Sequence, residues 1–439
     1  MKKAVKGLSL LITMIMIVSM FLIACSKNTG GDNAPAPTTE PSAAAEETAA
    51  PKEPVKLTFS YWGSPDEKKA IEKATAMFTE KYPWITVETL QIPNSDYNTK
   101  MTAMAAGNNT PDTGYMTPDL GDTWAKEGRF VNLFEMLDAD PEVKRDSFLD
   151  YIWYKQSPDN AWGISTAGEC FGLFYNKDLL QAIGETPPAK AADAWNWDKF
   201  VEVAKKLTLD KNGKNASEAG FDPTSIKQYG VSFETWAEPL NNFIFSNGGD
   251  WLSKDGKEFT LHHPEATEAI QKLSDLINVH HVAPSPLAAK SLPGMAVALQ
   301  NKIVAMGIGG QWMNLDLGNA KVNYDIGVLP KLKKSLTVAL SGATVLFKDS
   351  KHPQEAWMLF KWMSNPEGAI ELYSGGLWMP TMKEWYTNPD LIAKWVDANP
   401  AANPPGFKDA MMNQLLENGV HAVGYYLNNI AVVKSTVIS

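Results

Sequence analysis

Four tryptophans stand at predicted strand ends or turns, where side chains can face a ligand. Trp62 directly follows a predicted strand, and Trp236 comes shortly after another. Trp312 follows a pair of glycines, and Trp378 lies in a glycine-rich turn. Indole is hard to bury completely and offers a flat apolar face with one N–H donor. The pattern predicts aromatic surfaces that cover a small ligand, although each tryptophan could instead pack in the core.

Three carboxylates occupy comparable positions and could accept hydrogen bonds from a ligand. Asp119 follows the third predicted strand, Glu169 stands just before Phe171–Tyr175, and Asp250 follows Gly248-Gly249. Asp119 could instead cap the helix that comes after it. Glu169 could be an exposed charge, and we expect Asp250 to be the weakest candidate of the three.

The apolar spacing alternates between strand and helix periods, which predicts an α/β fold. Predicted strands cover residues 55–61, 85–92, 113–117, 171–175, 229–233, 303–308, 324–329 and 340–347. Predicted helices cover residues 66–82, 96–106, 197–207, 238–246, 264–279 and 353–364. The strand–helix–strand–helix order at the start implies a parallel sheet with helices on both faces. Such sheets bind ligands at the carboxyl ends of their strands, where Trp62 and Asp119 are predicted to lie.

The charge balance excludes some partners. The chain has 439 residues and a formal charge of -10, and no basic face is visible, so we do not expect it to bind nucleic acid. Arg129 and Arg145 are its two arginines. Because anionic ligands are usually held by arginine forks, this scarcity favours a neutral ligand.

The motifs of common enzymes and metal sites are missing. Neither GxSxG nor HExxH occurs, and Gly307–Gly310 is not followed by the helix and third glycine of a dinucleotide loop. His262-His263 and His280-His281 are adjacent pairs whose side chains would point apart on a helix. We therefore predict no catalytic residues, no bound metal and no cofactor.

The first residues have the pattern of a bacterial export signal. Lys2, Lys3 and Lys6 precede an apolar run from Leu8 to Ala24, which is short for a membrane span. The run ends in Leu22-Ile23-Ala24-Cys25, which looks like a lipobox. This predicts a signal peptide at 1–24 and a lipid on Cys25 that anchors the protein to the outer face of the cell membrane. An ordinary signal peptide or an uncleaved anchor is the alternative.

Residues 25–54 are predicted to be a disordered linker, because 28–54 is a low-complexity run of Ala, Pro, Thr, Glu and Gly. If Cys25 carries a lipid, Cys170 has no partner and no disulfide forms within the chain. We expect Cys170 to be a small buried side chain.

From Val55 to Asn388 the chain resembles the extracellular solute-binding proteins of carbohydrate ABC importers, the group that includes maltose-binding protein. The resemblance rests on the order and spacing of several motifs, and no single one is decisive. Besides the lipobox they are Thr58–Gly63, Asn108–Asp112, Phe174–Leu180, Val304–Met306 with Gly310 and Trp312, Val322–Pro330, Glu355–Ser364 and Gly375–Pro380.

The resemblance implies a two-lobed, periplasmic-binding-protein-like (type II) fold with a hinge and a ligand cleft between the lobes. By that pattern lobe 1 takes residues 55–168 and 335–380, and lobe 2 takes 169–334 and 381–439. It also implies that a sugar binds in the cleft, that the lobes close over it, and that membrane permease subunits receive it. Asp119 and Glu169 match positions where the family places sugar-binding carboxylates. We expect a monomer.

The end of the chain departs from the family pattern. Tyr425–Ser439 ends in β-branched residues without a closing helix, whereas family members usually continue for another helix or two. A truncated chain is one explanation of this departure, so we predict no packing for the end of the second lobe.

Two other functions remain open at this point. A receptor of the same fold could take a polyamine or peptide, since acids and aromatic rings also bind cations. An extracellular glycoside hydrolase would also line a cleft with tryptophan and use two carboxylates, for which Asp119 and Glu169 could serve. The lobe-like order of elements argues against the hydrolase.

Overall fold

The computed structural model describes residues 52–253 and 257–421, which belong to one compact unit. The expected signal peptide, Cys25, nearly all of the expected linker and the stretch Tyr425–Ser439 lie outside the described residues. Within the described residues, no helix is both long and apolar enough to cross a bilayer.

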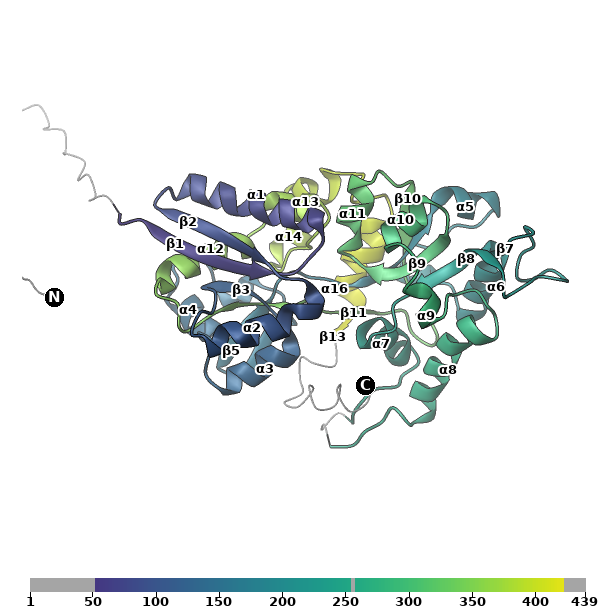
Figure 1. Cartoon of the computed structure of the whole chain (residues 1–439), viewed down its shortest axis with the longest axis horizontal. Helices are drawn as coiled ribbons and strands as arrows, with labels where there is room; N and C mark the ends of the chain where they lie inside the picture. The colour runs from purple at the N-terminus through teal and green to yellow at the C-terminus, as the bar shows by residue number, and fades with distance from the viewer. Residues whose placement is uncertain (1–51, 254–256, 422–439) are drawn as a thin grey trace, which may run out of the picture. The chain divides into compact units, whose positions relative to one another are not determined.

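The first sheet has six strands in the order β2-β1-β3-β12-β5-β4 (Figure 1). Its strands are β1 (Val55–Tyr61), β2 (Ile85–Gln91), β3 (Thr113–Met116), β4 (Trp153–Ser157), β5 (Asn160–Ser165) and β12 (Ala343–Leu346). The helices of this part are α1 (Pro65–Lys81), η1 (Asn94–Asp96), α2 (Tyr97–Ala106), α3 (Pro118–Lys126), α4 (Leu133–Ala139), η2 (Arg145–Ser147), α12 (Pro353–Ser364) and α13 (Ile370–Ser374). We call this sheet with these helices lobe 1.

The second sheet has five strands in the order β10-β6-β9-β8-β7 (Figure 1). They are β6 (Phe171–Asn176), β7 (Leu209–Asp210), β8 (Ile226–Phe233), β9 (Val304–Gly310) and β10 (Tyr324–Gly327). Their helices are α5 (Lys177–Ala182), η3 (Ala191–Asp193), α6 (Trp197–Leu207), α7 (Ala237–Ser246), α8 (Pro264–Asn278), α9 (Pro286–Ala289), α10 (Met295–Gln300) and α11 (Met313–Asn319). We call this part lobe 2.

The remaining elements contact both lobes. They are β11 (Thr337–Ala339), α14 (Glu384–Thr387), α15 (Pro389–Ile392), η4 (Ala393–Asp397), η5 (Lys408–Asn413), α16 (Gln414–Asn418) and β13 (Gly419–His421). β11 and β13 pair with each other, η4 contacts α13 of lobe 1, and η5 contacts β6 and β10 of lobe 2. Because this segment contacts both lobes, it does not belong to one of them alone. The residue boundaries predicted for the two lobes therefore stay a prediction.

The expected α/β elements are present, but the expected parallel sheet is only partly right. β1 pairs in parallel with β2 and β3, as the order of elements predicts. β12 is antiparallel to both β3 and β5, and β6 is antiparallel to β9 and β10. The chain that returns from lobe 2 enters the first sheet beside the carboxyl end of β3, where Ala343 pairs with Met116. A strand that starts at that end must run against its neighbour.

Asp140, at the end of α4, holds α4 and α12 together inside lobe 1. Its carboxylate accepts hydrogen bonds from Trp357 Nε1 at 2.7 Å and Lys361 Nζ at 2.8 Å. It also accepts the backbone N–H groups of Glu142 and Val143. Burial would raise the pKa of Asp140, but these donors outweigh burial and hold the pKa at about 2.

Asp140→Ala should lower the free energy of unfolding by about 3 kcal/mol near neutral pH, because it leaves a partly buried lysine and an indole N–H without their acceptor. The contribution of Asp140 is present above the ordinary carboxyl pKa and is lost as the pH falls towards 2, so the difference should shrink in acid. Denaturant unfolding at pH 7 and pH 3 measures it. Glu142→Gln is the matched control: Glu142 also bonds Lys361 but is 73% exposed, so the change should stay below about 1 kcal/mol. Equal losses in the two variants would contradict this account.

Candidate functional site

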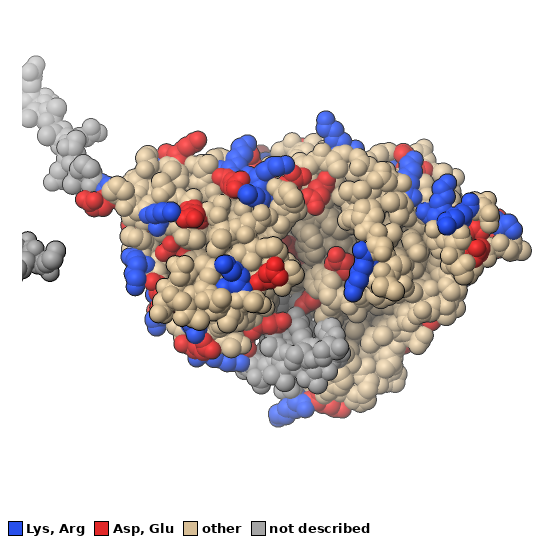
Figure 2. Space-filling model, in the orientation of Figure 1, with Lys and Arg blue, Asp and Glu red and all other residues tan. Residues whose placement is uncertain are grey.

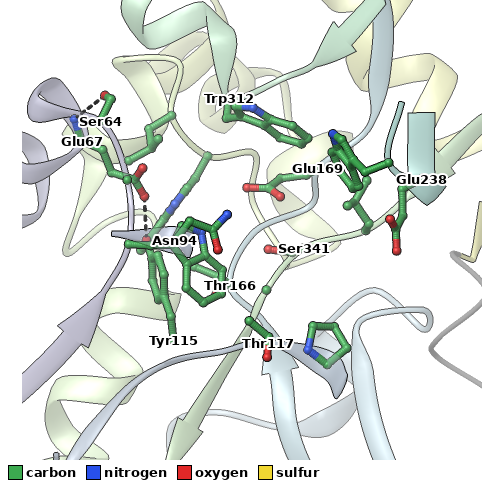
Figure 3. Close-up of a pocket in the computed structure, with 18 of the residues that line it drawn as sticks. Ser64, Glu67, Asn94, Tyr115, Thr117, Thr166, Glu169, Glu238, Trp312 and Ser341 are labelled. Carbon is green, nitrogen blue, oxygen red and sulfur yellow. Dashed lines mark hydrogen bonds between the residues drawn. The ribbon is translucent and has the colours of Figure 1, made fainter. Parts of the chain in front are cut away.

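A cavity of about 590 Å³ lies between the two lobes. Figure 2 shows the molecule hollowed in this region, and Figure 3 shows the side chains that face the space. Lobe 1 and the loops after its strands contribute Trp62, Gly63, Ser64, Glu67, Asn94, Tyr115, Thr117 and Pro118. Lobe 2 contributes Glu234, Trp236, Glu238, Trp312 and Asp316. The segments that run between the lobes contribute Thr166, Glu169, Leu340, Ser341, Gly342, Leu377 and Trp378.

Five of the seven residues singled out in the sequence meet at this cavity. They are Trp62, Glu169, Trp236, Trp312 and Trp378. They come from five separate stretches of chain that the two sheets bring together, and each stands at or near a strand end or in a turn. Each was selected for its position near a strand end or in a turn, and these positions meet in one space.

Asp119 and Asp250 do not line the cavity. Helix α3 begins at Pro118, so Asp119 lies in its first turn, while the preceding Thr117 and Pro118 face the space. Thr117, and not Asp119, is the N-cap residue of α3. Asp250 folds back on its own turn, where its Oδ1 accepts the backbone N–H of Trp251 at 2.7 Å.

The aromatic wall of lobe 1 is built around Trp62. Its ring lies edge-on to Tyr97 and to Tyr115, each with a centroid distance of 4.9 Å. Gly342 allows this placement, because a Cβ there would lie 2.4 Å from the Trp62 ring. Trp378 backs the same wall behind Tyr115 but is only 2% exposed, so it offers a ligand little surface.

The aromatic wall of lobe 2 consists of Trp236 and Trp312 over Phe171. The two indoles lie 6.5 Å apart with a tilt of 34°, and Phe171 packs against both. Gly310 makes room for the Trp312 ring, since a Cβ at Gly310 would lie about 2.0 Å from it. Trp236 is 36% exposed and its Nε1 donates to the Glu234 carboxylate, so one face of this wall is open to a ligand.

The cavity is rich in carboxyl groups and lacks basic ones. Its five acidic residues are Glu67, Glu169, Glu234, Glu238 and Asp316. Among the described residues that line it, none is Lys, Arg or His. An anionic ligand would therefore meet repulsion without compensation, whereas hydroxyl groups or a cation would find acceptors.

Glu67 is held in the cavity wall by a capping box at the start of α1. Ser64 Oγ accepts the backbone N–H of Glu67 at 3.2 Å, and the Glu67 carboxyl group accepts the backbone N–H of Ser64 in return. Tyr115 donates its hydroxyl to Glu67 Oε1 at 3.1 Å (Figure 3). The carboxyl group lies against Gly63, where a Cβ would come within 1.8 Å of Glu67 Oε2 and where φ is +147°. Only glycine leaves this space for the Glu67 side chain.

Burial controls the protonation of these acids. It raises the pKa of Glu67 to about 8, against the hydrogen bonds from Tyr115 and Ser64 that favour the charged form. Burial also raises the pKa of Glu169 well above its usual range; the charge of Glu67 adds to this shift, and a hydrogen bond with Ser341 opposes it. The carboxyl groups of Glu67 and Glu169 point into the same space (Figure 3). Two protonated carboxyl groups can donate hydrogen bonds as well as accept them.

Several of these residues were missed by sequence reasoning. The Ser64-x-x-Glu67 pattern is a readable capping-box signal, but it predicts a helix start and not a cavity wall. Tyr115 is one of the four buried residues of a short strand, and Asp316 is a first-turn acid of α11. Neither has a local pattern that distinguishes it from a structural residue.

One group of metal-type ligands occurs away from the cavity in the described part of the chain. Atoms of Glu258, His262 and His263 lie within 4.8 Å of one another on the surface. Adjacent histidines had been expected not to converge, and here both approach one glutamate. None of the three lines the cavity, and exposed groups of this kind are common without an ion.

Solved structures with the same fold are two-lobed substrate-binding proteins. One is the ABC substrate-binding protein Lmo0181 from Listeria monocytogenes in complex with cycloalternan, with a TM-score of 0.73 and 21% identity over 88% of this chain and 99% of that one. Another is maltose-bound MalE3 from T. maritima, with a TM-score of 0.69 and 20% identity over 86% and 91% of the two chains. The chain therefore has the two-lobed fold expected from its sequence.

Sequence comparison gives the family. The melibiose/raffinose/stachyose-binding protein MelE of Bacillus subtilis is 26% identical over 310 residues, 66% of this chain and 64% of that protein. The chain spans between about half and two thirds of the length of the first curated relatives that it matches. The model of the family described as bacterial extracellular solute-binding protein matches residues 61–370, well over half of the chain. The chain belongs to the bacterial extracellular solute-binding protein family.

Proposed function

We propose that this protein binds a neutral saccharide in the cavity and delivers it to the permease subunits of an ABC importer, without catalysis. The observation that carries the proposal is the cavity itself, in which tryptophans from both lobes face a space surrounded by hydroxyl, amide and carboxyl groups. A relative that binds melibiose, raffinose and stachyose, and structural neighbours in complex with maltose or cycloalternan, support the same class of ligand.

Aromatic rings would supply most of the affinity. A sugar ring has apolar C–H faces that Trp62 could cover from lobe 1, and Trp236 and Trp312 from lobe 2. Burying ~100 Å² of apolar surface contributes about 2.5 kcal/mol. Because the three rings come from both lobes, a saccharide that touches all of them would hold the lobes together.

The polar groups would supply the discrimination between sugars. Asn94, Thr117, Thr166 and Ser341 offer uncharged hydrogen-bonding groups, and Glu169 offers a carboxyl group from the segment between the lobes. A sugar hydroxyl that enters the cavity without a partner costs about as much as a good hydrogen bond contributes. The pattern of polar groups would therefore select a linkage and a stereochemistry.

Titration calorimetry against neutral oligosaccharides, such as raffinose and maltose, should identify at least one that binds. Trp312→Ala should then weaken binding by about 50-fold, since it removes roughly 100 Å² of apolar contact. Trp84→Ala is the control, because Trp84 packs near Tyr82 and does not line the cavity. The same mixtures should contain unchanged oligosaccharide after prolonged incubation. Hydrolysis products, or no binding by any neutral saccharide, would argue against the proposal.

A second candidate function is a receptor for a solute that carries an amine. The specific observation in its favour is the presence of five acidic residues and no basic residue among the described lining residues. An ammonium group would neutralise Glu67 and Glu169 and could lie against the indole faces through cation–π contacts. The names of the relatives support saccharides, so we rank this candidate second.

The sign of the pH dependence separates the two candidates. A neutral saccharide excludes more water from Glu67 and favours its protonated form, so affinity should fall as the pH rises above about 8, by up to tenfold per unit. An amine-bearing solute favours the ionised form and releases a proton on binding, so affinity should rise between pH 6 and 8. Calorimetry across pH 6–9 in two buffers of different ionisation enthalpy measures both effects. Glu67→Gln should flatten either profile, and a profile that keeps its slope in this variant would assign the titration to another group.

We also propose that the protein is held on the outer face of the cell membrane by a lipid on Cys25. Membership of an extracellular solute-binding family and the Leu22–Cys25 motif support this location. Cys25→Ser should move the protein from the membrane fraction to the culture medium, or leave it uncleaved, when it is expressed in a bacterium that lipidates such motifs. Metabolic labelling with a fatty acid followed by fractionation tests this. Fatty-acid incorporation that persists in the variant would contradict the assignment.

A further inference from the structure

A hydrogen bond and a second polar contact join the lobes at the edge of the cavity. Ser64 Oγ, at the start of α1 in lobe 1, donates to Asp316 Oδ1 in α11 of lobe 2 at 3.0 Å. One turn along α11, Asn319 lies near Asp66, and after Lys69 it is the second group that lowers the pKa of the Asp66 carboxyl group. Figure 1 shows the start of α1 close to α11, and the two helices are in contact. Both contacts therefore depend on how the two lobes are placed.

The same serine also fixes a cavity residue. Ser64 Oγ accepts the backbone N–H of Glu67 while its own proton goes to Asp316. The contact with lobe 2 thus orients the hydroxyl group that caps α1, and this cap holds Glu67 between Gly63 and Tyr115. Ser64, Glu67 and Asp316 all line the cavity.

Charge alone would push these two helix ends apart. Lobe 1 presents Asp66, and lobe 2 presents Asp316. The nearby Lys69 already pairs with Asp66 on its own helix. The groups that make the contact favourable are therefore the neutral donors Ser64 and Asn319. The N-terminus of α1, a helix of 17 residues, adds a favourable field for the Asp316 carboxylate.

We propose that Ser64–Asp316 and Asp66–Asn319 form a latch that holds the lobes together and, through Ser64, positions Glu67 in the cavity wall. Ser64, Asp316 and Asn319 are positioning residues in this sense. The latch consists of one hydrogen bond and one further polar contact between like-charged surfaces, so it is weak enough to open. A ligand that touches both lobes would then shift the balance by its own binding energy. Only this last step rests on the proposed function.

Disulfide trapping tests the latch without any ligand. Cysteines at positions 66 and 319 (Asp66→Cys with Asn319→Cys) should form a disulfide in a glutathione redox buffer, and their effective concentration reports how often the lobes meet. Adding Asp316→Ala should lower this effective concentration about fivefold, which corresponds to one net hydrogen bond. Asp316→Asn, which keeps an acceptor oxygen for Ser64, should retain most of it. Cys25 is replaced by serine in every variant, and Cys170 is buried with its thiol pKa raised by burial, so it should not interfere.

A second cysteine pair controls for general loss of structure. Lys73 and Glu371 form an ion pair between α1 and α13, both in lobe 1. Cysteines at these two positions should cross-link equally well with and without Asp316→Ala. An unchanged effective concentration at 66 and 319 in the Asp316→Ala protein would overturn the latch, as would an equal fall at both pairs. Neither result would bear on saccharide binding, so failure of the latch and failure of the proposed function can be told apart.

Discussion

Glu67 and Glu169 face one cavity that has no basic side chain among its described lining residues, and burial keeps their protons on at higher pH than usual. In most proteins a buried carboxylate is paired with a cation or is bound by several N–H groups. Asp140 in lobe 1 follows that rule, and its pKa is correspondingly low. The cavity carboxyl groups do not follow it, and they are kept in place by helix capping, by Tyr115 and by Ser341 instead of by opposite charge. This leaves Glu67 and Glu169 able to donate as well as accept hydrogen bonds, which suits a ligand made of hydroxyl groups.

On both sides of the cavity, a glycine leaves room for a tryptophan ring. Trp62 lies over Gly342 and Trp312 over Gly310, and a side chain at either glycine would occupy the position of the indole. Both contacts join residues near strand ends. Each ring is therefore held against the backbone of a sheet and not against other side chains that can move. Rings that are fixed before a ligand arrives lose little freedom when it binds. The two walls are therefore rigid, while the distance between them is set by the arrangement of the lobes.

The sequence predicted more of the fold than of the site. Periodicity identified the strands and helices that build both lobes, because each element has one buried face. It missed the antiparallel entry of β12, since strand direction depends on where the chain returns from lobe 2. Position after a strand identified Trp62, Trp236 and Trp312, whose bulk makes them unusual at such places. The same argument chose Asp119, but Pro118 starts a helix one residue earlier, and the cavity is faced by Thr117 and Pro118 instead. A shift of one residue decides which side chain reaches the ligand, and propensity does not resolve such shifts.

Glu67 and Asp316 show why a site between two lobes is hard to derive from one chain. Each has a sufficient local explanation as a first-turn acid of a helix, and nothing nearby in sequence distinguishes it from Glu355 or Glu384, which occupy similar positions. Ser64 and Asp316 are 252 residues apart in the sequence, and the fold brings them within hydrogen-bond distance. The role of these residues therefore depends on the fold and not on the local sequence. The helix cap, the cavity wall and the contact between lobes then share one hydroxyl group. A change at Ser64 would alter all three at once. The contribution of the lobe contact therefore has to be separated at Asp316 and Asn319, where a substitution leaves the capping side chain in place.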